Sequence, residues 1–239
     1  MHPAVAVILS YVSGSIPAAW LAGKWSGVDL RAHGSGNLGA TNVVRVLGAK
    51  IGLLVFAVDI AKGALPVRFL PRYTDPAVIG GGVHAYTVIA IACGIAAIVG
   101  HIRPVFLGFQ KGGKGVATAC GVFLALAPIQ ALLSLLIFVV VLLASGYVSL
   151  GSLTAAFSLP VLVAASLGVA SPIFAVAALT AVFVFWTHRA NIQRLRSGSE
   201  YRFGKAANFG RRPSLAIGIA LLVLAAAFLS ARYAGGGAR

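Results

Sequence analysis

Acidic side chains are scarce in this chain, which has only 4 Asp and Glu residues against 19 Lys and Arg. Four carboxylates in total cannot build the aspartate-rich Mg²⁺ site that acts on lipid diphosphates. No His is followed five residues later by Asp, and no GxSxG nucleophile elbow is present. The sequence therefore predicts binding of an anionic substrate without a metal, a cofactor, a covalent nucleophile or a carboxylate base.

Cysteine and charge are scarce as well. Cys93 and Cys120 both lie in apolar runs, which excludes a disulfide framework and a CxxC metal pair. Only 10% of the residues are charged, where a soluble protein has roughly 25%. The hydrophobic fraction is 59% and the mean hydropathy is +0.97, so the composition predicts an integral membrane protein.

Apolar runs of roughly 17–25 residues are typical of membrane-spanning helices. Such runs lie near residues 4–22, 51–70, 83–100, 115–128, 129–145, 150–168, 171–188 and 213–231. They predict an all-α polytopic membrane bundle with seven core spans and an eighth, C-terminal span. The first run has no basic segment before it and no cleavage motif after it, so we interpret it as a retained span. The fourth is short, and the glycine loop before it could dip into the bilayer where protein or water covers it.

Positive charge is distributed unevenly over the loops that join these spans. With eight spans, fourteen cations fall on one side of the membrane and four on the other. Cationic loops stay in the cytoplasm, so we expect three polar stretches to face the cytoplasm and both termini to face the opposite side. The net charge of +15 is explained by these loops, and we predict no nucleic-acid partner.

The first polar stretch, residues 34–45, reads GSGNLGATNVVR. It matches GxGxxG, but a membrane helix rather than a strand precedes it, which argues against a dinucleotide site. Glycines still allow backbone N–H groups to converge on an anion. Ser35, Asn37, Thr41 and Asn42 add neutral hydrogen-bonding groups, and Arg45 adds a bidentate clamp for phosphate or carboxylate. The alternative is a flexible connecting loop.

The second stretch, residues 101–118, reads HIRPVFLGFQKGGKGVAT. It begins like a Walker A loop, but Gly115 stands where Ser or Thr would bind Mg²⁺, so an ATPase is excluded. Gly112 and Gly113 lead into a helix whose N-terminus favours an anion. We predict that Lys114 contacts substrate, while Lys111 could equally be an ordinary flanking cation. The role of His101 stays open.

The third stretch, residues 188–200, reads HRANIQRLRSGSE. His188 and Asn191 are three residues apart, so both would lie on one face of a continuing helix, beside an Arg cluster. An interfacial His without further function is the alternative. Elsewhere, the opposite charges of Asp59 and Lys62 inside one span predict an ion pair between them, and direct substrate contact is the alternative. Ser149 and Ser152 could donate to a phosphate or cap the sixth span.

These three stretches closely resemble the motifs of the bacterial membrane family of acyl-phosphate:glycerol-3-phosphate acyltransferases, over about residues 4–203. The resemblance implies a seven-span inner-membrane enzyme that moves a fatty acyl group from acyl phosphate to the 1-hydroxyl of glycerol 3-phosphate, giving lysophosphatidic acid and phosphate. It implies that Ser35, Arg45, Lys114, His188 and Asn191 hold glycerol 3-phosphate. The first glycine loop (Gly34, Gly36, Asn37, Gly39), with Thr41 and Ser152, would surround the acyl-phosphate head.

From these observations we expect residues 1–203 to form the acyltransferase core and residues 204–239 to add a linker and an extra span. Ser35, Lys114 and His188 are the expected catalytic residues. The remaining expected substrate contacts are Arg45, Asn191, Gly34, Gly36, Asn37, Gly39, Thr41, Asn42, Gly112, Gly113, Ser149 and Ser152. We expect a monomer in the inner membrane. The alternatives are a transporter for a phosphorylated anion and a protein that only binds anionic lipid headgroups.

Overall fold

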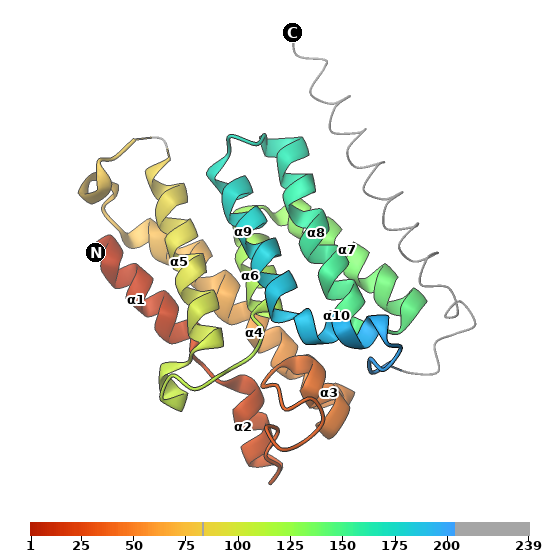
Figure 1. Ribbon diagram of the computed structural model, residues 1–239. Coiled ribbons are helices and arrows are strands. Elements are labelled where there is room, and N and C mark those ends of the chain that lie inside the picture. Colours follow the sequence, from red (N-terminus) through yellow and green to blue (C-terminus); the bar gives the residue numbers. More distant parts are fainter. Residues whose placement is uncertain (83, 204–239) are drawn as a thin grey trace. The chain divides into compact units, whose positions relative to one another are not determined.

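The computed structural model describes residues 1–82 and 84–203, and all regular secondary structure in these residues is helical (Figure 1). Four of the described helices are long and apolar enough to cross a membrane, and a bent helix pair would add a fifth. The all-helical membrane architecture predicted from composition is therefore confirmed for the described residues. The predicted count of seven or eight spans is not, and the expected span at residues 213–231 lies outside the described residues.

The first of two units covers residues 1–126. Its helices are α1 (Pro3–Gly14), α2 (Ala18–Trp25), α3 (Ala40–Leu47), α4 (Ala49–Phe69), α5 (Ala85–Ile102) and α6 (Val116–Leu126), with short 3₁₀ turns η1 (Leu70–Tyr73), η2 (Pro76–Ile79) and η3 (Val105–Leu107). Helix α4 is central, because α1, α2, α3, α5 and α6 all contact it. This position explains how α4 can carry Asp59 and Lys62 although its length would suit a membrane span.

Small residues let the helices of this unit approach each other closely. A side chain at Gly63 of α4 would overlap the Thr118 carbonyl of α6, and one at Gly121 of α6 would overlap the Ile60 carbonyl of α4. Helices α1 and α5 meet in the same way at Gly14. Lipid tails supply no hydrophobic drive for helix association, so close backbone packing at small residues has to hold such helices together.

Two loops of the first unit lie at the same end of its helices (Figure 1). One joins α2 to α3 and carries the start of the first polar stretch, and the other joins α5 to α6 and carries the second. The predicted first span is broken at residues 15–17, where Pro17 separates α1 from α2. The fourth predicted span is the 11-residue helix α6, as short as expected.

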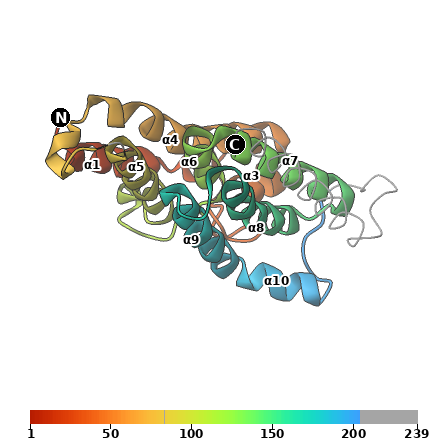
Figure 2. The ribbon, with the colours of Figure 1, turned by 90° about the horizontal axis from the view of Figure 1, so that it is seen from above.

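The described part of the second unit covers residues 127–203. It contains α7 (Pro128–Ser145), α8 (Val148–Leu167), α9 (Pro172–Thr187) and α10 (Arg189–Arg196), and α8 packs between α7 and α9. The prediction of one helix continuing through His188 is wrong. Helix α9 ends at Thr187, and α10 leaves it at 59° (Figure 2). The apolar residues of α9 give way there to the charged sequence RANIQRLR, which suits water rather than lipid.

Candidate functional site

Asn42 of α3 holds the first polar stretch in shape. Its Oδ1 atom accepts a hydrogen bond from the Ser35 N–H at 2.8 Å, and its Nδ2 atom donates to the carbonyls of Leu30 and His33, each at 3.1 Å. The side chain is almost completely buried. Its amide is thus occupied by the loop backbone, which gives Asn42 a supporting position rather than the direct substrate contact expected from sequence.

Gly34 is needed where this loop passes Asn42. Its φ is +64°, and a Cβ atom there would overlap Asn42 Oδ1. Only glycine combines the left-handed conformation with so close an approach. Ser35, next in the chain, is exposed, with its backbone N–H fixed by Asn42 and its hydroxyl at the loop surface.

The other predicted residues of this stretch lie around the start of α3. Gly36 has φ +66°, and Asn37 lies beside Gly39, which precedes the helix. Thr41 and Arg45 follow on α3 and are half-buried. The loop and α3 therefore bring the predicted residues of this stretch together at one end of the unit.

The second loop is tightly folded around its glycines. The Gly112 N–H donates to the Ile102 carbonyl at 2.9 Å, and the Gly113 N–H donates to the His101 carbonyl at 3.3 Å. These two amides are satisfied internally. The first turn of α6, from Val116, presents the N–H groups that lack an intrahelical acceptor. Lys114 is half-buried between this turn and the glycine pair.

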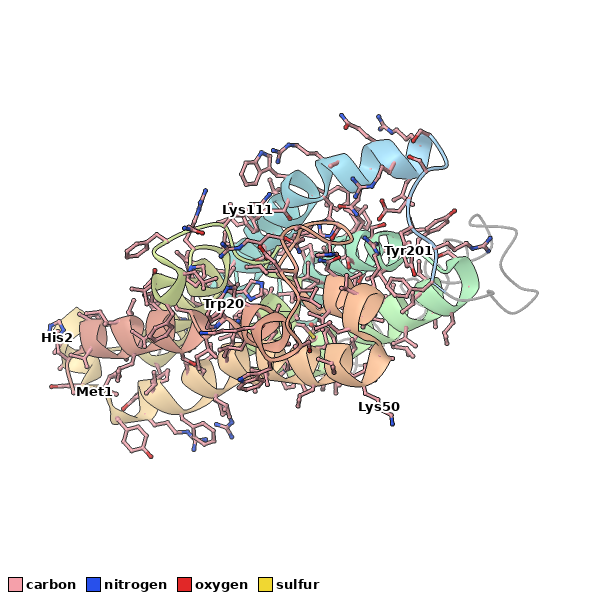
Figure 3. The ribbon with its side chains drawn as sticks, turned by 90° about the horizontal axis from the view of Figure 1, so that it is seen from below. Met1, His2, Trp20, Lys50, Lys111 and Tyr201 are labelled. Carbon is pink, nitrogen blue, oxygen red and sulfur yellow. The ribbon has the colours of Figure 1, made fainter. Side chains whose placement is uncertain are left out.

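The first two polar stretches meet within the first unit. Arg31 Nη1 donates to Gln110 Oε1 at 2.9 Å, and a Cβ atom on Gly113 would approach the Leu38 carbonyl oxygen to 2.9 Å. Figure 3 views the unit from below and labels Trp20 and Lys111. Lys111 is exposed, whereas Lys114 is partly enclosed, which fits the distinction made from sequence.

A buried charged cluster lies beneath the second loop. Lys62 Nζ is 2.8 Å from Asp59 Oδ1, which confirms the predicted ion pair, and it also donates to the Ile16 carbonyl at 2.7 Å. His101 Nδ1 lies 3.5 Å from the same Asp59 oxygen. A small pocket of about 240 Å³, including its open mouth, is lined by this cluster, by Gly112 and Gly113, and by apolar residues of α2 and η3.

In the second unit, His188 lies at the corner between α9 and α10 and is buried. Its Nδ1 atom is 2.8 Å from the Val184 carbonyl. A carbonyl oxygen only accepts, so Nδ1 carries a proton and donates to it. Beside it, Arg189 stacks on Trp186, with its guanidinium carbon 5.1 Å from the ring centroid.

Glu200 orients Asn191. Its Oε1 atom accepts from Asn191 Nδ2 at 2.6 Å, and its Oε2 atom accepts from Arg194 Nε at 2.7 Å. Burial acts to raise the pKa of this carboxyl, but hydrogen bonds from Asn191 and Arg194, the nearby Ser149 hydroxyl and the charge of Arg194 outweigh it and lower the pKa below the ordinary 4.5. Glu200 therefore stays ionised and fixes which way the Asn191 amide points.

Ser149 and Ser152 lie on the first turns of α8 and are buried. Neither caps the helix, because Tyr147 occupies the N-cap position and Ser152 Oγ donates to the Val148 carbonyl at 2.9 Å. The prediction that these serines could cap the helix is therefore wrong. The Ser149 hydroxyl faces the Glu200 carboxyl and contributes to its lowered pKa, at a geometry looser than a strict hydrogen bond.

The structure thus groups the predicted residues into two sets. Ser35, Arg45, Lys114 and the glycines belong to the first unit, and His188, Asn191, Ser149 and Ser152 belong to the second. Sequence reasoning missed the role of Glu200 in orienting Asn191, and its position inside the third polar stretch was the available signal. Among the described residues, no three His, Cys, Asp or Glu side chains gather as metal ligands would.

Known proteins similar to this chain fall in one family. The family model described as glycerol-3-phosphate acyltransferase matches residues 4–198. A glycerol-3-phosphate acyltransferase of Geobacter sulfurreducens is 42% identical over 205 residues, covering 85% of this chain and 98% of that protein. Its counterpart from Myxococcus xanthus is 46% identical over 198 residues, covering 82% and 97%.

Two solved structures agree with these relatives. The crystal structure of PlsY, an integral membrane glycerol 3-phosphate acyltransferase, in its glycerol 3-phosphate form has a TM-score of 0.75 at 40% identity. It covers 84% of this chain and 96% of that one. The lysophosphatidic acid form of PlsY has a TM-score of 0.70 at 39% identity, with coverages of 84% and 95%. With the family model matching most of its length, this chain belongs to the glycerol-3-phosphate acyltransferase family.

Proposed function

We propose that this protein transfers a fatty acyl group from acyl phosphate to the 1-hydroxyl of glycerol 3-phosphate. The observation that carries the proposal is the close approach of the two glycine loops in the first unit, where Gly113 lies beside the Leu38 carbonyl. It supports a shared site to which Arg45 and Lys114 both contribute. A guanidinium offers two parallel donors to a phosphate, and an ammonium adds a compact charge. Family membership supports the acyl-transfer chemistry.

The acceptor would be held through its phosphate. Arg45 and Lys114 bind the phosphate oxygens, Ser35 donates its hydroxyl, and Asn191 and His188 complete the site from the second unit. Fixing the acceptor hydroxyl beside the acyl carbon can lower the barrier by several kcal/mol, because it removes the entropy cost of the encounter.

The donor would enter from the membrane. Its acyl tail lies among apolar helices, and its phosphate reaches the first glycine loop, Thr41 and Ser152. Because Ser152 donates to the Val148 carbonyl, its oxygen can still accept a hydrogen bond, and rotation of the hydroxyl would free its proton for a phosphate.

The chemical step needs one bond formed and one broken. The acceptor hydroxyl oxygen attacks the acyl carbon, the bond from that carbon to the phosphate oxygen breaks, and inorganic phosphate leaves with the electron pair. The hydroxyl proton goes either to Nε2 of His188 or directly to the leaving phosphate, which carries enough negative charge to accept it. Phosphate is a good leaving group, so the step does not depend on a strong base. Backbone N–H groups at the start of α6 stabilise the developing oxyanion.

The membrane context follows the charge distribution. Cations flank the polar stretches, and the bias of cationic loops towards the cytoplasm supports a site at the cytoplasmic face of the inner membrane. Glycerol 3-phosphate would then reach it from the cytoplasm and the donor from the bilayer. We infer that a single copy of the chain suffices, because the proposed site uses residues of one chain only.

The test is a donor comparison with purified protein in detergent. Palmitoyl phosphate with glycerol 3-phosphate should give lysophosphatidic acid and phosphate in the presence of EDTA and without ATP, whereas acyl-CoA and acyl carrier protein should be poor donors. Equal or better turnover with acyl-CoA would refute the acyl-phosphate assignment. Uptake of labelled glycerol 3-phosphate by proteoliposomes without lipid formation would instead indicate a transporter.

A matched pair of lysine variants tests the site itself. Lys114→Ala should lower kcat/KM at least a hundredfold, because it removes the cation of the glycine turn. Lys50→Ala, which removes an exposed cation at the start of α4, should change it less than twofold. Near-normal turnover of Lys114→Ala would contradict the proposed acceptor site.

A further inference from the structure

The charged cluster beneath the second loop has no role in the chemistry described so far. Asp59, Lys62 and His101 are each at most 6% exposed. Ionisable side chains inside membrane helices are costly and are retained where they pair or serve a function. A simple ion pair between α4 residues would need only Asp59 and Lys62. The third member, His101, belongs to the second polar stretch.

The His101 ring connects the cluster to the glycine loop. Its Nδ1 atom lies 3.5 Å from Asp59 Oδ1. On the other side of the ring, Nε2 and Cε1 are packed against Gly113 so closely that a Cβ atom there would overlap both. The His101 carbonyl also accepts the Gly113 N–H, and a Cβ on Gly112 would overlap that carbonyl. The loop corner therefore rests on one residue through both its ring and its backbone.

Lys62 fixes the other side of the cluster. Its ammonium donates to Asp59 and also to the carbonyl of Ile16, which lies at the break between α1 and α2. The Asp59 carboxylate is thereby held between an ammonium and an imidazole. The chain of contacts runs from the α1–α2 break through Lys62, Asp59 and His101 to Gly113, one residue before Lys114.

We infer that Asp59, Lys62 and His101 are positioning residues that hold the Gly112–Gly113 corner and so place Lys114 for the acceptor phosphate. The inference rests on the proposed role of Lys114. The cluster thereby serves the binding of glycerol 3-phosphate, and it takes no part in the acyl-donor site. None of the three residues needs to touch substrate.

Steady-state kinetics and glycerol 3-phosphate binding by calorimetry test this inference in the full-length protein. His101→Ala should raise the KM and the Kd for glycerol 3-phosphate about tenfold or more, because a shift of the loop misplaces Lys114. The KM for palmitoyl phosphate should change less than threefold. His101→Asn keeps a donor near Asp59 and should recover part of the loss. Asp59→Asn combined with Lys62→Met, which avoids an unpaired buried charge, should resemble His101→Ala.

A double-mutant comparison separates positioning from general stability. Gly113→Ala should weaken glycerol 3-phosphate binding strongly in the wild-type background and less in the His101→Ala background, because the overlap with the ring is gone and only the 2.9 Å approach to the Leu38 carbonyl remains. Gly112→Ala is the matched control. It meets the His101 carbonyl, which truncation of the ring leaves in place, so its effect should be equal in both backgrounds.

The results have distinct meanings. Additive losses for Gly113→Ala and His101→Ala, or equal changes in the KM of both substrates, would overturn the positioning role. A lower thermal stability of His101→Ala with unchanged KM and Kd would also overturn it and leave a packing role. Wild-type protein that binds glycerol 3-phosphate but does not use acyl phosphate would refute the proposed donor alone, since the Kd values still decide the inference. Wild-type protein that does not bind glycerol 3-phosphate would refute both.

Discussion

Individual polar side chains in this protein divide into those that can meet a substrate and those that hold the loop carrying them. Sequence reasoning identified the polar stretches and expected a direct substrate contact from both Asn42 and Asn191. Asn42 and Asn191 are both amides in a motif, yet Asn42 is used up by three backbone hydrogen bonds, while Asn191 is oriented from one side by Glu200. The difference depends on which groups the fold brings near, and a single sequence does not contain that information.

Replacing Asn42 should therefore act first on stability. Asn42→Ala leaves the buried carbonyl of Leu30 and the N–H of Ser35 without their partner, and an unsatisfied buried group costs about 1–3 kcal/mol. We expect a lower thermal midpoint in detergent, measured by fluorescence of the purified protein, together with a raised KM for glycerol 3-phosphate. The exposed Lys50→Ala variant should unfold at the wild-type temperature. An unchanged midpoint for Asn42→Ala would contradict the supporting role of Asn42 in the loop.

Glu200 should make the second unit sensitive to acid. Its pKa is lowered in the folded protein, so its stabilising contribution is fully present above the ordinary 4.5 and is lost as the pH falls through the folded value. Arg194 is 41% exposed, which limits the ion pair to about 1 kcal/mol or less. The thermal midpoint of wild type should fall in this acidic range more steeply than that of Glu200→Gln. Parallel curves for the two proteins would contradict this prediction.

Helix positions were largely predictable from apolar runs, but helix breaks were not. The runs near 129–145 and 150–168 correspond closely to α7 and α8. The break at Pro17 and the turn at His188 escaped prediction, because apolar composition continues through the first and a helical pattern continues through the second. Helix α3 was also missed, because its eight residues lie inside a motif that suggested a loop.

The close contact between α4 and α6 gives a prediction at this scale. Gly63→Leu should destabilise the first unit strongly or prevent its folding, because the side chain would overlap the Thr118 backbone of α6. Overpacking of this kind costs about 1–3 kcal/mol or more. Ala57→Leu is the control, since Ala57 lies on an exposed position of the same helix. Detergent-extracted yield and thermal midpoint measure both, and equal behaviour of the two variants would argue against close α4–α6 packing.

For the molecule as a whole, sequence predicted that three remote polar stretches assemble into one site. The structure brings the first two together within one unit, through Arg31 and Gln110 and through Gly113 beside Leu38. The third belongs to the other unit, and its meeting with the first two stays a prediction. Composition gave the membrane class because it sums over the whole chain, whereas assembly of a site depends on how separate helices dock.

Cross-linking tests the predicted meeting of the first and third polar stretches. In a variant with Cys93 and Cys120 replaced by Ala, cysteines at Ser35 and Arg189 should be linked by a short bis-maleimide, because the proposed acceptor site uses residues of both stretches. The linked chain should migrate faster in denaturing gels, and glycerol 3-phosphate should change the rate of linking. A cysteine pair at Ser35 and Val169, at the far end of α8 from Ser149 and Ser152, should not be linked. Linking of the control pair alone would refute the joint site.

The corner at His188 also predicts how deep this part of the protein lies in the bilayer. Trp186 with its stacked Arg189 combines an aromatic ring and a cation, the two kinds of side chain that settle where hydrocarbon meets headgroups. His188, which lies between them in the sequence, is therefore expected at the boundary between the acyl chains and the polar headgroups. Catalysis in this protein should therefore follow bilayer thickness, because a thinner or thicker membrane tilts the anchored helix and carries the imidazole away from that level.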